Sequence, residues 1–345
     1  MTDILKQVAA IDVAQDKLDV SLGRINQYLV KEVYAFKTFD NNETGFSALI
    51  KWVKKFAGMK IPVRYVMEAT GVYHQRLAYY LSDNGCRVSI ILPNKIRNFI
   101  KSLDIKTITD KTASYGICRF GIDNNPMIWH KPKELFLVLR QLSRERDQLI
   151  VERTVAKNQL HAEKAEAFPN KGTIARLNQR IELFQSQEKE IRKEMERLIR
   201  QDAELMGKVK KIITIPGVGL LTATIVLAET NGFDLIRSKK QLTSYSGLDV
   251  EEKESGTSVK KKPKISKKGN RHLRKAMYMP SLTAIRHDDY FRGLYARLIS
   301  KHGIKMKAAV AVQRKILELI YTLWKNDSVY DPKYMQNKAE KLLIA

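Results

Sequence analysis

The chain has 345 residues, 44% of them hydrophobic, and its 62 Lys and Arg against 37 Asp and Glu give a net charge of +25. This length allows two or three domains with cores of their own. The charge is far above the magnitude of roughly 2–8 that keeps a small domain soluble, so it indicates a polyanionic partner, of which nucleic acid is the commonest. No run of about 18 apolar residues is present, which argues against a transmembrane helix and a membrane partner. The start of the chain lacks the basic-then-apolar layout of a signal peptide. Cys86 and Cys118 have no metal-ligand spacing and are expected to be small buried hydrophobes in a reducing cytoplasm.

Residues 1–125 predict an α/β domain, because strand and helix patterns alternate along them. Three strand patterns come first, and helices and strands then take turns. The predicted strands are 8–12, 17–23, 30–39, 63–67 and 88–92, and the predicted helices are 45–56, 73–81 and 110–120. This order predicts a mixed sheet with helices on its faces.

Residues 126–211 predict a long helical arm. From Pro132 onward the sequence is highly charged, and apolar residues recur at alternating spacings of three and four for about four repeats, as in a coiled-coil seam. The seam residues are Ile174, Leu177, Ile181, Phe184, Ile191, Met195, Leu198 and Leu205. The segment 168–172 contains Pro and Gly and breaks the pattern into two helices. We therefore expect a coiled-coil hairpin or a dimerisation arm without catalytic residues.

Residues 212–345 predict a mainly helical domain. Its start, Ile215-Pro216-Gly217-Val218-Gly219, resembles the turn of a helix-hairpin-helix element, in which Gly217 and Gly219 would let backbone amides approach a DNA phosphate. A plain turn between two helices explains the same sequence. Helices are expected at 276–299 and 306–323, and the tail after residue 326 is expected to be polar and weakly structured.

A hydroxyl-rich segment, Glu254-Ser255-Gly256-Thr257-Ser258, is followed by a basic block from Lys260 to Lys275. Nine of its sixteen residues are Lys or Arg, namely Lys260, Lys261, Lys262, Lys264, Lys267, Lys268, Arg271, Arg274 and Lys275. A solvated charged face is the simpler interpretation of such a run. Pro263 and Gly269 nevertheless predict a loop that wraps a phosphate backbone before a helix begins at Arg271. His272 is expected to contact DNA or to be structural, and a serine before glycine is by itself most often part of a turn.

Three carboxylates stand at the ends of predicted elements in the first domain. Asp12 lies near the end of the first strand, Glu68 closes the fourth, and Asp110 opens a helix. A buried acid is costly unless it is paired or binds a cation. Carboxylates from two strands and a helix suit Mg²⁺, which takes oxygen ligands and keeps several waters. Each acid alone is as well explained as a cap or turn residue.

Several segments in one order resemble a known family, the DEDD-type transposases of Piv-related insertion sequences, also called bridge-RNA-guided recombinases. The main segments are Ala10-Ile11-Asp12-Val13 with Asp19-Val20, Glu68-Ala69-Thr70-Gly71, Ile215-Pro216-Gly217-Val218-Gly219 and Glu254-Ser255-Gly256. Ser246-Gly247-Leu248 and Ser266-Lys267-Lys268-Gly269-Asn270 agree with it as well. The resemblance implies an RNase H-like (resolvase-like) domain, a coiled-coil arm and a C-terminal transposase domain with an active-site serine.

Residue by residue, the resemblance places the family's acids on Asp12, Glu68 and Asp110 as ligands of Mg²⁺, and its nucleophile on Ser255. One departure stands out, because the family's fourth acid would fall three residues after Asp110, where this chain has Ala113. We expect three acids and water to suffice. Replacement by Asp104, or an inactive copy, are the alternatives.

The resemblance further implies that Ser255 attacks a DNA phosphodiester, forms a phosphoserine link and frees a 3′-hydroxyl, with Lys253, Lys260 and Lys261 near enough in sequence to stabilise charge. It implies double-stranded donor and target DNA, a guide RNA, a dimer through the coiled coil and a tetramer during synapsis, in the nucleoid of a prokaryotic cell. The acids of one subunit would then meet the serine of another. A metal-dependent junction resolvase or nuclease, and a non-catalytic nucleic-acid-binding protein, are the alternative functions.

Overall fold

The computed structural model describes residues 3–57, 61–69, 71–103, 109–234, 236–255 and 259–334, without the side chains of residues 253, 255 and 259–262. The chain divides into two compact units, Met1–Lys131 and Pro132–Ala345, called here the N-terminal and C-terminal units. Each has its own hydrophobic core. The division into three domains made from the sequence stays a prediction.

The N-terminal unit is built on the predicted mixed sheet. Its strands are β1 (Ile4–Val13), β2 (Lys17–Asn26), β3 (Lys31–Asp40), β4 (Val63–Glu68) and β5 (Arg87–Ile91), in the order β3-β2-β1-β4-β5. The first three form antiparallel pairs, while β4 is parallel to β1 and β5 is parallel to β4. The mixed sheet is thus confirmed, and the observed strand bounds differ from the predicted ones by up to four residues.

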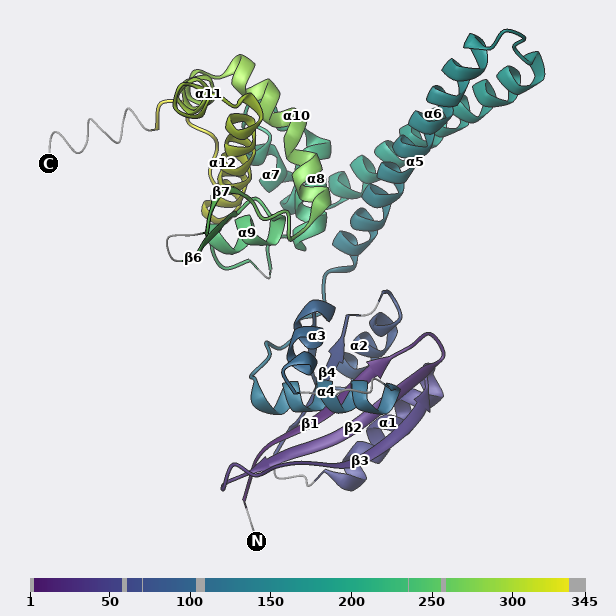
Figure 1. The fold of residues 1–345 in the computed structure, drawn as a ribbon, viewed down its shortest axis with the longest axis vertical. Coiled ribbons are helices and arrows are strands. Elements are labelled where there is room, and N and C mark those ends of the chain that lie inside the picture. Colours follow the sequence, from purple (N-terminus) through teal and green to yellow (C-terminus); the bar gives the residue numbers. More distant parts are fainter. Residues whose placement is uncertain are drawn as a thin grey trace, which may run out of the picture. The chain divides into compact units, whose positions relative to one another are not determined.

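Helices cover both faces of this sheet (Figure 1). Helices α1 (Glu43–Phe56) and α2 (His74–Asp83) pack on one face through Phe46, Leu49 and Leu77. Helices α3 (Pro93–Lys101) and α4 (Asp110–Asp123) pack on the other. Because side chains alternate along a strand, Ala9 and Ile11 of β1 face the first layer, and Val8 and Ala10 face the second. Asp12, two residues after Ala10, therefore belongs to the α3/α4 face.

Two features of this unit refine the expectations. Helix α3 was not predicted, although Pro93 at its first position is well placed to begin a helix, where its missing N–H costs nothing. Cys118 of α4 is fully buried against Gly23 of β2, and burial raises the pKa of its thiol to about 12. Cys86 is only half-buried.

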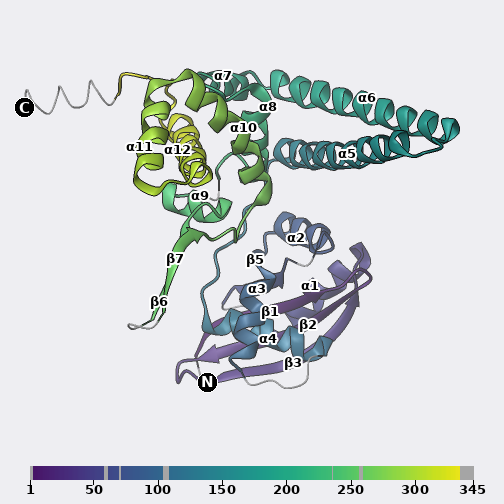
Figure 2. The ribbon, with the colours of Figure 1, turned by 45° about the horizontal axis from the view of Figure 1, so that its top comes forward.

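The C-terminal unit begins with two long helices joined by a short loop, α5 (Glu134–Ala165) and α6 (Lys171–Gln201), which lie side by side as a hairpin (Figure 2). The predicted break between them is confirmed. Leu177, Ile181, Ile191 and Met195 of the predicted seam are buried. The seam is therefore used within this hairpin, and its role in a coiled-coil dimer stays a prediction.

A helical body completes the unit around one core cluster. Its helices are α7 (Ala203–Ile212), α8 (Leu220–Thr230), α9 (Lys239–Ser246), α10 (Arg271–His287), α11 (Asp289–His302) and α12 (Lys305–Asn326). The single helix expected over 276–299 is wrong, because Asp288 ends α10 and accepts a hydrogen bond from Phe291 N at 3.0 Å to cap α11. No helix in the described part of the chain is long and apolar enough to cross a membrane.

The first part of the basic block is a strand, so the predicted loop is wrong there. Strands β6 (Val250–Ser255) and β7 (Val259–Ile265) form an antiparallel pair. Their register sets Glu251 opposite Lys264 and Glu254 opposite Lys260, an arrangement in which opposite charges favour pairing. Pro263 lies where the register shifts, which a strand with a free edge tolerates. Helix α10 begins at Arg271, as predicted.

Candidate active site

A row of polar side chains crosses the α3/α4 face of the N-terminal sheet. Asp12 of β1 pairs with Asp19 of β2, and Asp19 pairs with Thr38 of β3. On the other side, Ile11 pairs with Met67 in parallel register, so the next residue, Glu68, is the neighbour of Asp12. Directly opposed residues of adjacent strands point to the same face. The sheet itself therefore brings three carboxylates into one line.

Helix α4 brings a fourth carboxylate to this row. Thr109 caps the helix through a capping box, and Asp110 is its first residue. One turn later, Ser114 Oγ lies 2.8 Å from Ser21 Oγ in a buried hydrogen bond. Ser21 is two residues from Asp19 on the same strand face, so this bond fixes the first turn of α4 over the acidic row.

The charges of these residues converge on Asp12. Burial, together with the negative charges of Glu68, Asp110 and Asp19, raises the pKa of Asp12 to about 6, although the backbone N–H of Val13 opposes the shift. Of the three acids selected from the sequence, Glu68 and Asp110 thus each lie within electrostatic reach of Asp12. Burial and neighbouring like charges are ordinary causes of a raised carboxylate pKa, and such shifts are common at functional sites.

Asp19 was missed by the sequence interpretation as a site residue. Its side chain is only 8% exposed, and its Oδ1 accepts a hydrogen bond from Thr38 Oγ1 at 2.6 Å. Its place is set by the tight turn between β1 and β2, in which Ala14 N donates to Lys17 O. A hairpin around that turn places Asp19 opposite Asp12.

The oxygen chemistry of this row fits a divalent metal such as Mg²⁺. Within the described ranges, however, no three His, Cys, Asp or Glu side chains lie close enough together to enclose one ion. Ala113, on the first turn of α4, contributes no ligand. Asp104 lies outside the described residues. The donor set therefore suits a metal chemically, and the carboxylates would have to move closer together to hold one.

The predicted nucleophile, Ser255, is the last residue of β6 and pairs with Val259. Its side chain, the three residues that follow, and the side chains of Lys253, Lys260, Lys261 and Lys262 lie outside the described structure. The base of the hairpin is anchored, because Ser266 Oγ donates to Asp249 Oδ1 at 2.5 Å and Ser266 N donates to Asp249 O at 2.9 Å. The serine is therefore carried at the far end of a two-stranded ribbon with a fixed base.

Some of the remaining cations of the basic block are exposed, and others are bonded within the protein. Lys264, Lys267 and Arg271 are exposed, as phosphate contacts need to be. Arg274 donates to the carbonyls of Ser246 at 2.7 Å and Gly269 at 3.2 Å. These bonds give Arg274 a structural task besides any contact with DNA.

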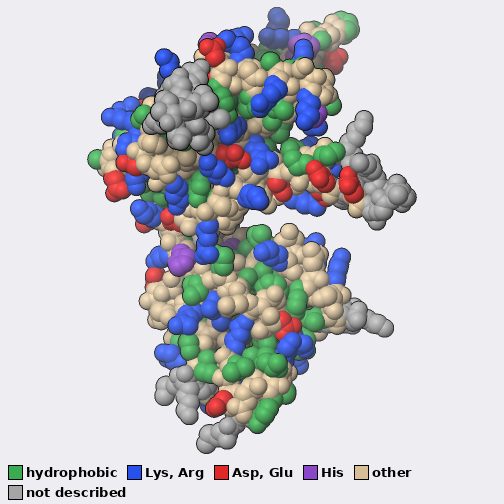
Figure 3. Space-filling view, turned by 90° about the vertical axis from the view of Figure 1, so that its left-hand side faces the viewer, with side chains coloured by type: hydrophobic (Ala, Val, Ile, Leu, Met, Phe, Trp, Pro, Cys, Tyr) green, Lys and Arg blue, Asp and Glu red, His purple; other side chains and the backbone are tan. Residues whose placement is uncertain are grey.

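Two further cations of the block already have acidic partners. Lys275 pairs with Asp147 at 2.7 Å, and Lys268 pairs with Glu251 at 3.3 Å. Asp147 also lies 3.0 Å from His272 Nδ1, which supports the structural interpretation of that histidine. In Figure 3, Lys and Arg side chains are spread over the visible face of each unit.

A polar network fixes the start of α10 next to the hairpin base. Asn270 accepts from the backbone amides of His272 and Leu273, and it donates to Glu229 Oε2 at 2.6 Å. Glu229, fully buried in α8, also receives two hydrogen bonds from Arg144 of α5. Burial alone would raise the pKa of Glu229, but the hydrogen bonds from Arg144 and Asn270 outweigh it and hold that pKa below its ordinary value. Sequence reasoning missed this network.

The two glycines of the turn before α8 differ in their surroundings. A Cβ on Gly217, whose φ is +86°, would lie 2.4 Å from Pro280 O of α10. Glycine at that position is therefore required by packing within the protein. A Cβ on Gly219 would meet nothing within 4 Å. Of the two, Gly219 is open to a ligand, and a helix-hairpin-helix function stays a prediction.

Two family models match this chain. The model described as "Transposase IS116/IS110/IS902 family" matches residues 209–296, and a transposase model of the IS110 DEDD type matches residues 9–169. Together they span most of the chain, including the acidic row and the Ser255 segment. The chain belongs to the IS110 family of insertion-sequence transposases.

Relatives similar along their whole length agree with this assignment. The "Pilin gene-inverting protein" of Moraxella bovis and that of Moraxella lacunata are each 27% identical to the transposase over 334 residues, covering 95% of it and 98% of the relative. The "Transposase for insertion sequence element IS1328" of Yersinia enterocolitica is 22% identical over 283 residues, covering 74% and 81%. Membership places this transposase among proteins that rearrange DNA.

Among solved structures, the transposase is similar to Thermus RuvC, described as "T. thermophilus RuvC in complex with Holliday junction substrate". The match covers 32% of this chain and 90% of RuvC, at 9% identity and a TM-score of 0.25. A TM-score this low supports no inference about function, and the RNase H-like assignment stays a prediction.

Proposed function

We propose that this transposase cuts and rejoins DNA with Ser255 as the nucleophile and with the acidic row as a Mg²⁺-binding site. The observation that carries the proposal is the convergence of Glu68 and Asp110 on Asp12, within a chain of the IS110 family. The gene-inverting relatives support strand exchange as the outcome. Asp12, Glu68 and Asp110 would hold the ion, with Asp19 beside them.

The proposed step is balanced without an outside reactant. Oγ of Ser255 attacks the phosphorus of a DNA phosphodiester, the Oγ–P bond forms, and the P–O3′ bond breaks. The proton of the serine hydroxyl is transferred, on balance, to the leaving 3′-oxygen, which becomes a 3′-hydroxyl. Because the phosphoserine link keeps the bond energy, a 3′-hydroxyl of another strand can reverse the step and release the serine. Bound Mg²⁺ would neutralise charge at the phosphate and the leaving oxygen.

The chain's own residues do the rest of the work. The exposed cations Lys264, Lys267 and Arg271 would hold the phosphate backbone beside the hairpin. The acidic row and the serine belong to different compact units, so we propose that the acids of one subunit serve the serine of another. From the family resemblance we extend the proposal to a tetramer that exchanges strands under the direction of an element-encoded RNA.

The test is a covalent DNA–protein adduct that survives denaturation. Wild type, Ser255→Ala, Asp12→Ala and the control Ser258→Ala are incubated with cognate DNA, Mg²⁺ and guide RNA. We expect the adduct with wild type and Ser258→Ala and a loss of at least a hundredfold in the other two. An adduct that persists in Ser255→Ala would contradict the nucleophile. Cleavage without any adduct would favour a metal-dependent nuclease, in which the acids activate water.

A further inference from the structure

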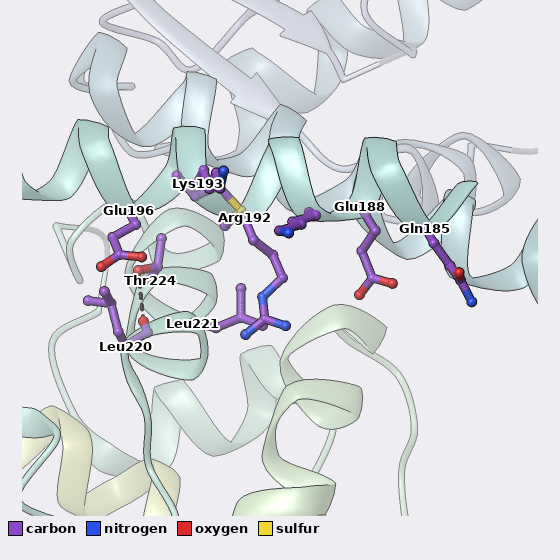
Figure 4. A pocket seen from close by; sticks show the side chains of 10 residues that line it. Gln185, Glu188, Arg192, Lys193, Glu196, Leu220, Leu221 and Thr224 are labelled. Atoms are coloured by element: carbon purple, nitrogen blue, oxygen red, sulfur yellow. Dashed lines mark hydrogen bonds between the residues drawn. The ribbon is translucent and has the colours of Figure 1, made fainter. Parts of the chain in front are cut away.

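A groove of about 390 Å³ lies in the C-terminal unit between α6 and the start of α8. Figure 4 shows Arg192 extending from α6 toward the α8 side, near Leu221, with Lys193 and Glu188 on the same helix. Leu220, Leu221 and Thr224 form the opposite wall. The groove is separate from the basic block that follows Ser255, and it serves no role in the chemistry proposed above.

The acids that line this groove already have partners. Glu188 accepts from Arg146 at 2.8 Å and from Arg153 at 2.5 Å, and both of these arginines come from α5. Glu196 pairs with Arg200, one turn further along α6. The negative charge of the groove is therefore compensated within the arm.

The cations of the groove have no such compensation. Lys189, Arg192 and Lys193 are exposed, and no hydrogen bond or ion pair joins their side chains to any residue that the structure describes. Lys189 and Lys193 are one turn apart, about 6 Å along the helix axis. These three cations therefore form a row of positive charge that is longer than a single small anion.

The opposite wall of the groove adds N–H groups that carry partial positive charge. Gly219 is the N-cap of α8, and no side chain caps the helix. The first N–H groups of a helix lack partners within it and carry partial positive charge. Because the space around Gly219 is open, an anion in the groove can reach them.

We propose that this groove binds the phosphodiester backbone of a nucleic acid strand, held by Lys189, Arg192 and Lys193 on one side and by the start of α8 on the other. The inference goes beyond the proposed strand chemistry, since it assigns a backbone contact to the arm. The strand can belong to DNA or to RNA, because both present the same phosphodiester. Phosphate contacts of this kind position a nucleic acid without reading its sequence.

The test compares two triple variants that each remove three positive charges from α6. The groove variant is Lys189→Ala/Arg192→Ala/Lys193→Ala. The control is Lys171→Ala/Arg176→Ala/Arg180→Ala, at exposed positions near the other end of the helix. Affinity is measured against salt concentration for a duplex of arbitrary sequence and for a single-stranded RNA of equal length.

The plot of log K against log salt has a negative slope for a protein that binds phosphates. With duplex DNA, the groove variant should make this slope less steep by about 2–3, since each lost phosphate contact removes about 0.9 from its magnitude. The control variant should keep the wild-type slope more closely. A change confined to one probe would assign the strand to DNA or to RNA. Equal losses in both variants, or none in either, would overturn the groove as a binding site. Adduct formation is a separate readout, so failure here leaves the serine proposal untouched.

A second variant separates binding from folding. Gly219→Asp supplies a favourable cap for α8, in the extended backbone conformation that an N-cap takes. Its carboxylate also places negative charge at the mouth of the groove. We expect unchanged or higher thermal stability together with several-fold weaker binding. Wild-type affinity in Gly219→Asp would contradict the role of the α8 start.

Discussion

Each unit of this transposase contains an acid that is at least partly buried, and the two acids differ in the charges that surround them. Glu229 of the C-terminal unit is fully buried, and Arg144 and Asn270 satisfy both of its carboxylate oxygens. Asp12 of the N-terminal unit is half-buried, and its neighbours Glu68, Asp110 and Asp19 are themselves acids. The pKa of Glu229 is therefore lowered, and that of Asp12 is raised to about 6.

The difference separates a structural acid from a functional one. Glu229 is complete without a ligand, and its bonds join α5, α8 and the start of α10 beside the hairpin that carries Ser255. Asp12 is held by a sheet and a capped helix in a position that costs stability. A fold maintains such a cost where function needs the group. Neutralising the two acids should therefore have opposite effects on stability.

The largest effect is expected from Glu229→Gln. The substitution leaves Arg144 and Asn270 without their ionised partner, and breaking such a pair costs about 3–5 kcal/mol when it is fully buried. Since the Arg144 side chain is half exposed, about 2–4 kcal/mol is expected. Hydrogen exchange of peptides from each unit measures the loss, which should be confined to the C-terminal unit. Glu204→Gln, at an exposed i,i+4 pair with Lys208, is the control and should cost less than about 0.5 kcal/mol.

A smaller effect, of opposite sign, is expected from a divalent cation. At a concentration a hundredfold above its Kd, Mg²⁺ or Mn²⁺ should stabilise the N-terminal unit by about 2.7 kcal/mol. Asp12→Asn and Asp110→Asn should each remove most of this gain. Asp16→Asn, at an exposed position in the turn between β1 and β2, should keep it. Equal stabilisation of all variants would show that the cation binds elsewhere.

Much of the sheet could be predicted because its signals are local. A short apolar run located β1, strand patterns separated by turn residues located β2 and β3, and the later alternation of helices and strands indicated a mixed sheet. The secondary-structure prediction was wrong where pairing between two strands outweighs the residue composition of one of them. The segment 259–265 is rich in Lys and contains Pro263, yet it is a strand because the acidic β6 lies opposite it.

The site was predicted in part for a similar reason. Asp12, Glu68 and Asp110 stand at ends of elements, where a sequence pattern is informative. Asp19 lies inside a strand, and only its register with Asp12 shows that it belongs to the row. Glu229 depends on Arg144 and Asn270, which are 85 and 41 residues away in sequence. Such partners follow from tertiary packing, which no local pattern contains.

The smallest effect concerns pH and tests the origin of the raised pKa of Asp12. Well below its ordinary pKa of 3.8 the carboxyl is protonated in both the folded and the unfolded chain, so Asp12→Asn should change nothing there. Between its ordinary value of 3.8 and its folded value of about 6, the folded state binds more protons, so wild type loses stability as pH rises. Above that range, and without divalent cation, Asp12→Asn should be more stable by about 1–2 kcal/mol, after allowance for partial exposure. Hydrogen exchange of the N-terminal unit at several pH values measures the difference. A variant less stable than wild type at neutral pH would show that Asp12, like Glu229, is held by partners within the fold.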